Sequence, residues 1–493
     1  MPELSLGDPS TTPAKRSTSR IVVAVAAVAA LVVLVGGLFL VTRAGSEQAG
    51  AATPDEAATA MFAAIENEDL VALAELLHPG ERRTLAEPAF DIIDELIRLE
   101  IIDGSLDLAA VDGVDVEIEG LQYRVEAIPG AADLREVLID AGTLSVTADG
   151  EQLPIGETLR ERFGDEISEI DEAGSESIVS PEAGPVLVEY EGRWYVSIWY
   201  SAAEALRGFT SDAPVPALAD MPPAIGADTP EAAVDGLVDA LVELDLTTMI
   251  GMLDPEEAAA LYRYAPLFLD EAEASIDELL DEVAAADVSW SVESIEYAPT
   301  VDGDRASVEI TAVTFQVIAE DVAIVVSYSP DALAVDANVD GETYQGTLGF
   351  AGDTVTLDAT FEGVPVEAEV TFGETGVTGW AEVDGERYTG ELTIDPDGVC
   401  STVSFDGPDG SEEGCLGEFV GDPDVELLLG MYSGVDDLRL PTPSITATRH
   451  DGRWYVSPLL TLSDTYLTFL RGADADSVAA QLDLLQELAE SGY

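Results

Sequence analysis

The hexapeptide GRWYVS occurs twice in this chain of 493 residues, at 192–197 and at 452–457. An acidic residue precedes it both times, Glu191 in the first instance and Asp451 in the second. An acidic residue and Gly followed by Trp, Tyr and Val are typical of a tight hairpin turn that leads into a strand. Two copies of one hairpin predict two copies of one domain.

The start of a helix is repeated as well. Thr53 and Thr229 each precede a Pro, and a Thr cap with Pro in the first turn favours a helix start. The apolar residues then follow at helical spacing: Ala57, Met61, Ala64 and Ile65 in the first copy, and Ala233, Leu237, Ala240 and Leu241 in the second. The helix starts lie 176 residues apart (229 − 53) and the hairpins 260 apart (452 − 192), so the second copy contains about 84 additional residues (260 − 176).

The insertion falls at about 331–419 and has the pattern of β-structure. Val355, Leu357, Ala359 and Phe361 alternate with polar residues, and a second alternating run follows the Gly turn at 362–363. Alternation with period two on both sides of a turn predicts a half-buried antiparallel meander. The module is itself repetitive, because VDGETYQGTL at 339–348 is echoed by VDGERYTGEL at 383–392.

Residues 21–42 contain no charged side chain. A helix of this length spans about 33 Å, which is enough to cross the hydrocarbon core of a bilayer of about 30 Å. Lys15, Arg16 and Arg20 precede the stretch and Arg43 follows it, which predicts a cytoplasmic N-terminus and an extracytoplasmic bulk. A cleaved signal peptide is the alternative, and no Cys follows the stretch to carry a lipid anchor.

Charge restricts the partners of the chain. It has 98 acidic and 20 basic residues, a formal net charge of −78. Such a field repels nucleic acid phosphates, so no nucleic acid partner is expected. Solubility is the simplest interpretation of this acidity, and a role in binding cations or adaptation to a salty habitat are the alternatives.

The predicted fold class is α+β, with an N-terminal single transmembrane helix followed by two cone-like domains of helices and antiparallel sheet. The predicted organisation is a cytoplasmic tail at 1–20, the transmembrane helix at 21–42, a linker at 43–52, the first copy at 53–208, a Pro-rich linker at 209–228, and the second copy at 229–493 with the β insertion at about 331–419 and an amphipathic helix at about 476–490.

Candidate sites are few. His78 occupies the position of Asp254 in the other copy, before Pro79, where a capping role is expected, and His450 is expected to be solvated at the hairpin. Two isolated His residues predict neither a zinc site nor a His-activated nucleophile. Cys400 and Cys415 flank a short acidic loop, and outside the cytoplasm such a pair is expected to form a disulfide.

Acidic and aromatic residues give weaker indications. Carboxylate pairs are uninformative because about one residue in five is acidic, and the acidic residues around the Cys pair do not follow the spacing of a hand-type calcium loop; these are Asp395, Asp397, Asp406, Asp409, Glu412 and Glu413. They favour acidic turns, with a non-standard ion site as the alternative. The hairpin aromatics are expected to be core on one side and surface on the other, with a ligand pocket as the alternative: Trp194, Tyr195, Trp199, Tyr200, Trp454 and Tyr455.

These features together resemble the nuclear transport factor 2-like superfamily. The resemblance rests on the Thr-Pro helix start, on Asp69 and Asp245 before the second helix, on the Leu-Leu-x-Pro-x-Glu segment at 76–81 and on the final hairpin. The resemblance covers about 53–208 and 229–472 without the insertion. The chain also resembles tandem extracytoplasmic versions of the fold in high-GC Gram-positive bacteria. The resemblance implies a cone-shaped α+β fold. Enzymes of the superfamily place an Asp, or a His with an Asp, in the cone pocket, and no residue pair of this chain is matched to that set.

The sequence therefore predicts a non-enzymatic, membrane-anchored binding or scaffold protein of the cell envelope. No catalytic residue, metal ligand or cofactor is assigned, and the ligand-binding residues are unknown. The expected partners are the lipid bilayer through residues 21–42 and an envelope protein or small ligand. The alternative is an enzyme of the isomerase or dehydratase type with an Asp general base in a cone pocket. A third hypothesis gives the β insertion a role in adhesion.

Overall fold

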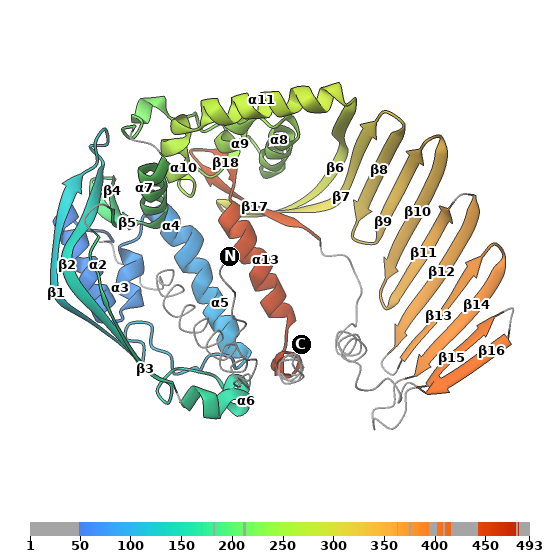
Figure 1. Ribbon diagram of the computed structural model, residues 1–493, viewed down its shortest axis with the longest axis horizontal. Helices are drawn as coiled ribbons and strands as arrows, with labels where there is room; N and C mark the ends of the chain where they lie inside the picture. The colour runs from blue at the N-terminus through green and yellow to red at the C-terminus, as the bar shows by residue number, and fades with distance from the viewer. Residues whose placement is uncertain are drawn as a thin grey trace, which may run out of the picture.

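The structure is a computed structural model that describes residues 49–168, 170–180, 183–210, 213–361, 363–373, 376–393, 402–407, 410–415, 442–479 and 482. Each half begins with helices and continues into antiparallel strands, and each ends with a helix (Figure 1). In the first copy the order is α2 (Pro54–Glu66), α3 (Leu70–Glu75), α4 (Pro79–Glu81), η1 (Arg82–Ala86), α5 (Glu87–Arg98), β1 (Val114–Ala127), β2 (Leu134–Asp149), α6 (Glu157–Ser168), β3 (Asp171–Ser177), β4 (Val186–Tyr190), β5 (Arg193–Ser197) and α7 (Ile198–Thr210).

The second copy has the same sequence of helices, strands and closing helix, with a longer sheet and, among the described residues, without an equivalent of α6. After η2 (Leu218–Asp220) come α8 (Pro230–Glu243), α9 (Leu246–Met252), α10 (Ala259–Tyr264), η3 (Ala265–Leu267) and α11 (Leu269–Ala285). The strands are β6 (Val288–Asp302), β7 (Arg305–Ala319), β8 (Val322–Ser329), β9 (Ala332–Val339), β10 (Glu342–Ala351), β11 (Thr354–Phe361), β12 (Val364–Gly373), β13 (Gly376–Val383), β14 (Glu386–Thr393), β15 (Thr402–Gly407), β16 (Gly410–Cys415), β17 (Ser444–His450) and β18 (Arg453–Val456), followed by α13 (Pro458–Gly472).

The predicted helix starts are confirmed. The Thr53 hydroxyl accepts a hydrogen bond from the backbone N–H of Glu56 at 3.2 Å, and Thr229 accepts one from Ala232 at 3.2 Å. These bonds satisfy backbone donors that the first turn of a helix leaves unpaired. At the other end of the chain, residues 475–479 are helical, and the rest of the helix predicted at 476–490 lies outside the described residues except residue 482.

Both GRWYVS hairpins hold the extended segment that precedes the first helix of their copy. The Arg193 guanidinium donates to the carbonyls of Ala49 and Gly50, and Arg453 donates to the equivalent carbonyls of Ile225 and Gly226. Gly50 and Gly226 have φ of +73° and +53°, and a Cβ on either would lie within 2.7 Å of a hairpin Tyr ring. Only Gly tolerates that combination of backbone angle and close contact.

The hairpin aromatics are more deeply buried than predicted. Trp194 packs in the core of the first copy around α2, whereas Tyr195 packs on the other side of β5 in a cluster that includes Ala260 and Tyr264 of α10. Tyr200, Trp454 and Tyr455 are also buried. The expectation of a surface side is wrong for β5, because Tyr195 is buried in a cluster to which residues of both copies contribute.

The predicted fold class is also wrong in its N-terminal transmembrane helix. None of the helices in the described part of the chain is both long enough and apolar enough to span a membrane. The longest, α11, has 17 residues and is rich in Asp and Glu. The helices that pack on the sheets keep one face in water, so their sequences are amphipathic rather than uniformly apolar. Residues 21–42 lie outside the described residues.

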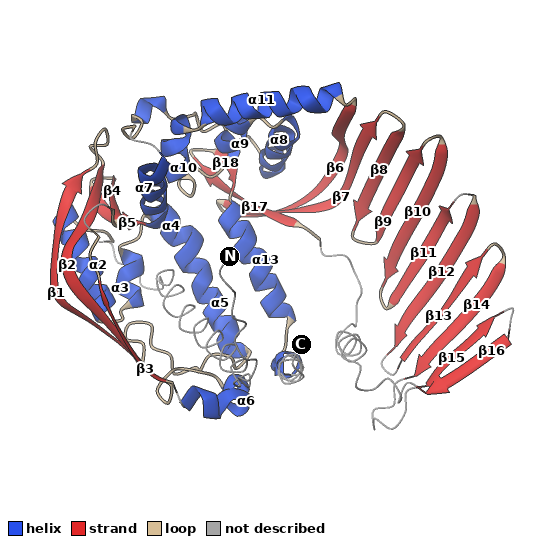
Figure 2. Cartoon of the chain, viewed as in Figure 1, coloured by secondary structure: helices blue, strands red, loops and turns tan. Residues whose placement is uncertain are grey.

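The antiparallel meander predicted for the β insertion is confirmed, but neither of its sides is covered by a described helix beyond β8. Strands β8 to β16 continue the sheet that β6 and β7 begin, and with β17 and β18 they form one antiparallel sheet of 13 strands, whereas the sheet of the first copy has five. No described helix lies over β9 to β16 in Figure 2, so this part of the sheet is a single layer. The physical reason is that β7 is long enough to pair with β17 at one end and with β8 at the other.

The two copies pack against each other through equivalent elements. Helix α5 of the first copy contacts α13 of the second, and α10 of the second contacts α7 of the first. The Arg98 guanidinium reinforces one of these contacts by donating to the carbonyl oxygen of Leu470 at 2.7 Å. The closing helix of each copy is therefore covered by a helix of the other copy, and the turns at 78–83 and 254–259 meet between them.

Candidate functional site at the junction of the copies

The two copies approach each other closely at Gly80, in α4. A Cβ built on Gly80 would lie 2.2 Å from the carbonyl oxygen of Glu256. Glu256 occupies the position in the second copy that Gly80 occupies in the first (256 − 80 = 176). A side chain at both positions would separate the copies, so the contact depends on a glycine in one of them.

Next to this contact lies a group of polar side chains that we call the junction cluster: Arg83, Asp254, Glu256, Thr448 and His450. Asp254 is its centre and is fully buried. One carboxylate oxygen accepts hydrogen bonds from the backbone N–H groups of Glu256 at 2.8 Å and Glu257 at 3.1 Å. This is the capping geometry that a short polar side chain adopts at the start of a helical turn.

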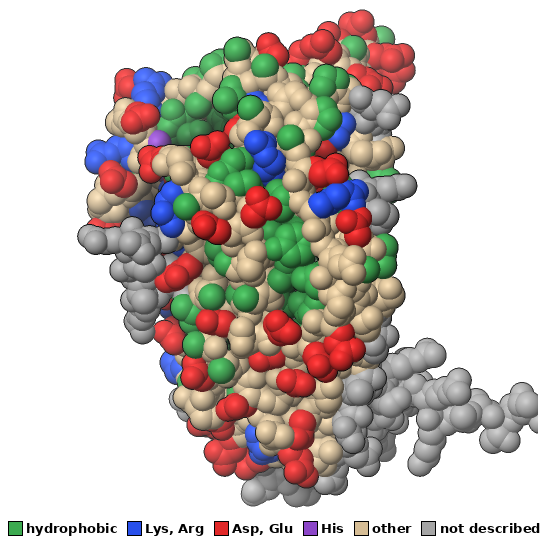
Figure 3. Space-filling view, turned by 90° about the vertical axis from the view of Figure 1, so that its left-hand side faces the viewer, with side chains coloured by type: hydrophobic (Ala, Val, Ile, Leu, Met, Phe, Trp, Pro, Cys, Tyr) green, Lys and Arg blue, Asp and Glu red, His purple; other side chains and the backbone are tan. Residues whose placement is uncertain are grey.

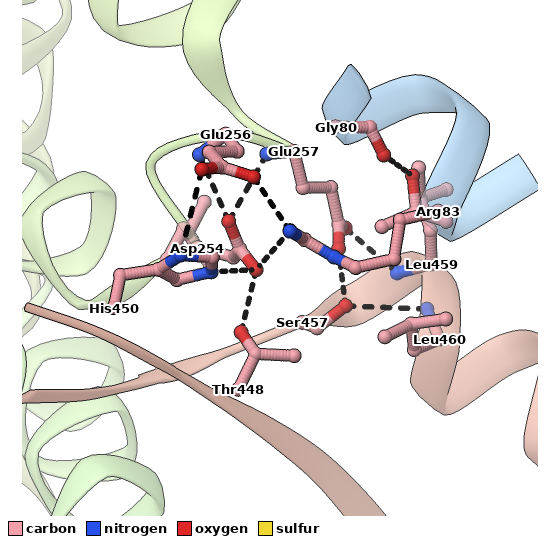
Figure 4. Close-up of polar contacts among 12 residues, drawn as sticks. Gly80, Arg83, Asp254, Glu256, Glu257, Thr448, His450, Ser457, Leu459 and Leu460 are labelled. Carbon is pink, nitrogen blue, oxygen red and sulfur yellow. Dashed lines mark hydrogen bonds and ion pairs between the residues drawn. The ribbon is translucent and has the colours of Figure 1, made fainter. Parts of the chain in front are cut away.

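The other oxygen of Asp254 binds three side chains (Figure 4). It accepts from Arg83 Nη2 at 2.8 Å, from the Thr448 hydroxyl at 2.5 Å and from His450 Nε2 at 3.0 Å. With the two backbone donors, the carboxylate has five partners. A buried carboxylate with this many donors has no lone pair directed at open space.

Arg83 carries the contact across the junction. It belongs to η1 of the first copy and also donates to Glu256 at 2.5 Å. A second Arg crosses in the opposite direction, since Arg263 of α10 lies 3.2 Å from Asp133 of the first copy and is almost completely buried. Buried ion pairs of this kind contribute more to the choice of one arrangement than to net stability, because desolvation offsets the attraction.

The electrostatics of the cluster favour charged side chains. Burial alone would raise the pKa of Asp254, but the hydrogen bond from His450 and the positive charge of Arg83 outweigh it and hold this pKa well below its ordinary value. The hydrogen bond to Asp254 raises the pKa of His450, against the effect of burial. His450 Nδ1 lies 3.6 Å from Glu256, so both ring nitrogens face carboxylates, as suits an imidazolium.

The first copy has different residues at the same positions. His78 is equivalent to Asp254 and Tyr190 to His450, and their rings meet edge to face with centroids 5.0 Å apart. Burial lowers the pKa of His78 to about 4, so its ring is neutral. Tyr190 donates to Glu256 at 3.3 Å. Glu256 therefore lies between the pair of the first copy and the pair of the second.

A second feature is the same in both copies. Glu81 and Glu257 are buried, and each accepts a hydrogen bond from the Ser that ends GRWYVS and from a backbone N–H of the helix that follows, Ile198 at 2.8 Å and Leu459 at 2.8 Å respectively. Burial raises the pKa of Glu81 to about 7. These carboxyls fix the turn between the hairpin and the closing helix, and neither lines an open pocket that the structure shows.

The junction cluster connects the two copies through ion pairs and hydrogen bonds. A general base needs an available lone pair near its substrate. Asp254 has none to offer, and both ring nitrogens of His450 face carboxylates. The geometry therefore suits a structural ion-pair network better than acid–base catalysis.

The prediction that His450 is solvated is wrong, since it is hydrogen-bonded to Asp254 and only 20% of its side chain is exposed. The capping role expected for His78 is also wrong, because its side chain makes no capping bond and packs against Tyr190 and Tyr195. The repeat offers a signal for the contact of His450 with Asp254. Positions 78 and 254 are equivalent in the two copies, and so are positions 190 and 450. In each copy the two positions face each other, and a His occupies one of them.

The remaining candidates stay predictions. Cys400 lies outside the described residues, so the disulfide with Cys415 is untested. Asp395, Asp397 and Asp409 of the acidic loop also lie outside the described residues. Within the described ranges no group of three or more His, Cys, Asp or Glu is arranged to hold a metal ion. Figure 3 shows acidic side chains spread over the whole face in view, a distribution that fits solvation of the surface.

A depression of about 500 Å³ lies beside α8. It is wide open and is lined by Asp228, Asp239, Glu243, Asp245 and Arg453, among others. None of the buried carboxylates at the junction reaches it. It therefore differs from the closed apolar pocket with a buried base that the enzyme hypothesis requires.

Comparisons of the chain with protein-family models, with curated proteins and with solved structures found no match.

Proposed function

We propose that this chain is a non-enzymatic binding or scaffold protein of the cell envelope, built on two copies of a nuclear transport factor 2-like cone. The order of helices, curved antiparallel strands and closing hairpin in each copy supports the cone. Location at the envelope is an inference from the sequence alone: residues 21–42, which the structure does not describe, carry no charge and follow three basic residues. Removal of the bulk of the chain by protease treatment of intact cells tests that location.

The observation that carries a binding role is the exposure of equivalent apolar side chains on the two closing helices. Leu206 and Phe209 of α7 correspond to Tyr466 and Phe469 of α13 (466 − 206 = 260). Phe209 is 90% exposed and Phe469 is 68% exposed. Large aromatic side chains presented to solvent are typical of the anchor residues of protein interfaces. A protein partner in the envelope is therefore the occupant that we propose for these helices.

The alternative of an isomerase or dehydratase has less support. Such an enzyme needs a carboxylate that can take a proton from a substrate held in an apolar pocket. Asp254 is the buried carboxylate paired with a His, and its five donors hold it ionised and occupied. It lies between the copies rather than inside either sheet.

The test is cross-linking in the envelope fraction followed by purification of the full chain. We expect one partner at constant ratio with the wild type and with Thr468→Ala, an exposed control on α13. Combined Phe209→Ser and Phe469→Ser should reduce recovery about tenfold or more, since truncation of an interface anchor costs about 2 kcal/mol or more. Equal recovery from both variants would count against these helices. A turnover reaction that Asp254→Asn abolishes would support the enzyme instead.

A further inference from the structure

One side of the single-layer sheet is apolar across every strand from β8 to β14. Strand pairing aligns a row of side chains that begins next to Tyr328 of β8 and crosses the sheet: Leu333, Leu348, Leu357, Ala368, Ala381 and Tyr388. Residues paired directly across antiparallel strands lie on the same side of the sheet. We call the side that carries this row the apolar sheet face.

The opposite side of the same strands is polar. Thr356 and Asp358 of β11 pair with Glu369 and Glu367 of β12. The aromatic exception, Trp380, is covered by the Arg387 guanidinium, 3.9 Å from the centre of its ring. Strands with one polar and one apolar side belong to a sheet that has water on one side only.

The apolar sheet face is continuous with the core of the second copy. Trp290 of β6 pairs with Val317 of β7, which pairs with Ile324 of β8 on this face. The Trp290 indole N–H donates to the carbonyl of Val242 at 3.1 Å, so α8 covers this side of the sheet at β6. Farther along, the face carries exposed side chains, including Phe361 at 52%, Tyr388 at 42% and Val383 at 38% exposure. The face is built like a core surface but lacks a described cover beyond β8 (Figure 2).

The size of the face matches that of a protein interface. Seven strands at about 4.8 Å spacing and about eight residues of about 3.3 Å each give a face of about 900 Å². Monomeric proteins seldom expose an apolar patch larger than about 300–600 Å². A standard interface buries about 800 Å² on each partner. We propose that two copies of this chain associate through the apolar sheet face, sheet against sheet, as a β-sandwich dimer.

A second copy fits the face for two reasons. Its regular rows of aliphatic and aromatic side chains are self-complementary, and twisted sheets of this kind pack about 10 Å apart at about −30°. Its charged positions on β8 to β14 are Glu342 and Glu386, which follow turns at the ends of strands. A partner recognised by its charge would need more charged side chains on the face than these two carboxylates. The dimer is independent of the partner proposed for the closing helices, which lie outside this sheet.

The net charge of −78 gives the dimer a diagnostic salt dependence. Two copies repel each other at long range, and salt screens that repulsion with a Debye length of about 8 Å at physiological ionic strength. Apolar contact at the face is not weakened by screening. Rising NaCl should therefore tighten the dimer, whereas it would weaken attachment of an oppositely charged partner.

The experiment is sedimentation equilibrium of the full chain in one fixed mild detergent, over a range of protein and NaCl concentrations. The test variant is Phe361→Glu, and the matched control is Thr360→Glu, the preceding residue on the opposite side of β11. We expect a reversible monomer–dimer equilibrium. Phe361→Glu should raise the dissociation constant of the dimer about tenfold or more, because a charge buried at an interface is strongly unfavourable. The control should raise the dissociation constant less than about threefold. Val335→Glu on β9 should repeat the effect of Phe361→Glu.

The outcomes separate the possible occupants. Because Phe361 is half exposed in one copy, its substitution should lower the unfolding temperature of the monomer only slightly. A chain that stays monomeric at every concentration overturns the proposal. So does a large loss of monomer stability in Phe361→Glu without a dimer, which would show that another part of the same chain covers the face. Equal weakening by Thr360→Glu would place the contact elsewhere.

Discussion

Replacing Asp254 by Asn tests whether the junction cluster holds the copies together through charge. Asn keeps an oxygen for the two backbone donors, and Asn and Asp cap equally well. Its amide nitrogen then faces Arg83, Thr448 and His450, which are all donors to Asp254. Removal of one partner from a buried ion pair costs about 3 to 5 kcal/mol. We expect about 3 kcal/mol, the lower end, because Arg83 is 30% exposed and keeps its bond to Glu256.

The matched control is Asp245→Asn. Asp245 caps α9 by accepting from the backbone N–H of Thr248 at 2.9 Å, the same role that Asp254 has in its turn. It has no Arg or His partner in the described part of the chain, so its substitution should change the free energy of unfolding by less than about 0.5 kcal/mol. Urea titration followed by Trp fluorescence measures both. A cost for Asp254→Asn as small as that of the control would refute the charge argument.

A double-mutant cycle then locates the effect at the junction. Arg83→Gln and Asp254→Asn should be coupled by about 1 to 3 kcal/mol, the range for residues in one ion-pair network. Arg83→Gln and Asp245→Asn should be additive within about 0.5 kcal/mol. Since Arg83 and Asp254 belong to different copies, coupling would show that the ion pair connects them in solution. Additivity in both cycles would mean that the copies separate there.

Two other changes probe the same region. His78 is neutral in the folded chain with its pKa lowered to about 4, so the unfolded chain binds a proton at this residue first as the pH falls below about 6.5. The free energy of unfolding should therefore fall by about 3 kcal/mol by pH 4. His78→Phe, which keeps the ring contact with Tyr190, should lack this loss, and equal pH profiles of the two proteins in urea titrations would contradict it. Gly80→Ala places a Cβ 2.2 Å from the Glu256 carbonyl and should cost about 2 kcal/mol, whereas Gly208→Ala in α7, with no atom within 4 Å, should not destabilise; similar melting temperatures for the two variants would contradict the tight contact.

Local features of this fold were predictable because they depend on residues close in sequence. The Thr caps at 53 and 229 act on backbone groups three residues away, and the alternation at 355–361 fixes which side chains share a side of the strand. The offsets of 176 and 260 also located the additional strands. Such patterns predict elements and their apolar sides, but they do not show what covers those sides.

The tertiary structure decided the contacts between distant segments. Asp254 and His450 are 196 residues apart, and among 98 acidic residues no spacing distinguishes the carboxylate that His450 meets. The second side of β5 is buried in a cluster that joins residues of the first copy to Ala260 and Tyr264 of α10 in the other copy. The insertion is the predicted antiparallel meander, but it forms a single-layer extension of the sheet rather than a half-buried one, because β7 pairs with β8 beyond its contact with β17. Sequence patterns determined which surfaces are apolar, and packing between the copies determined which of them are buried, because burial depends on neighbours that the chain brings together only when it folds.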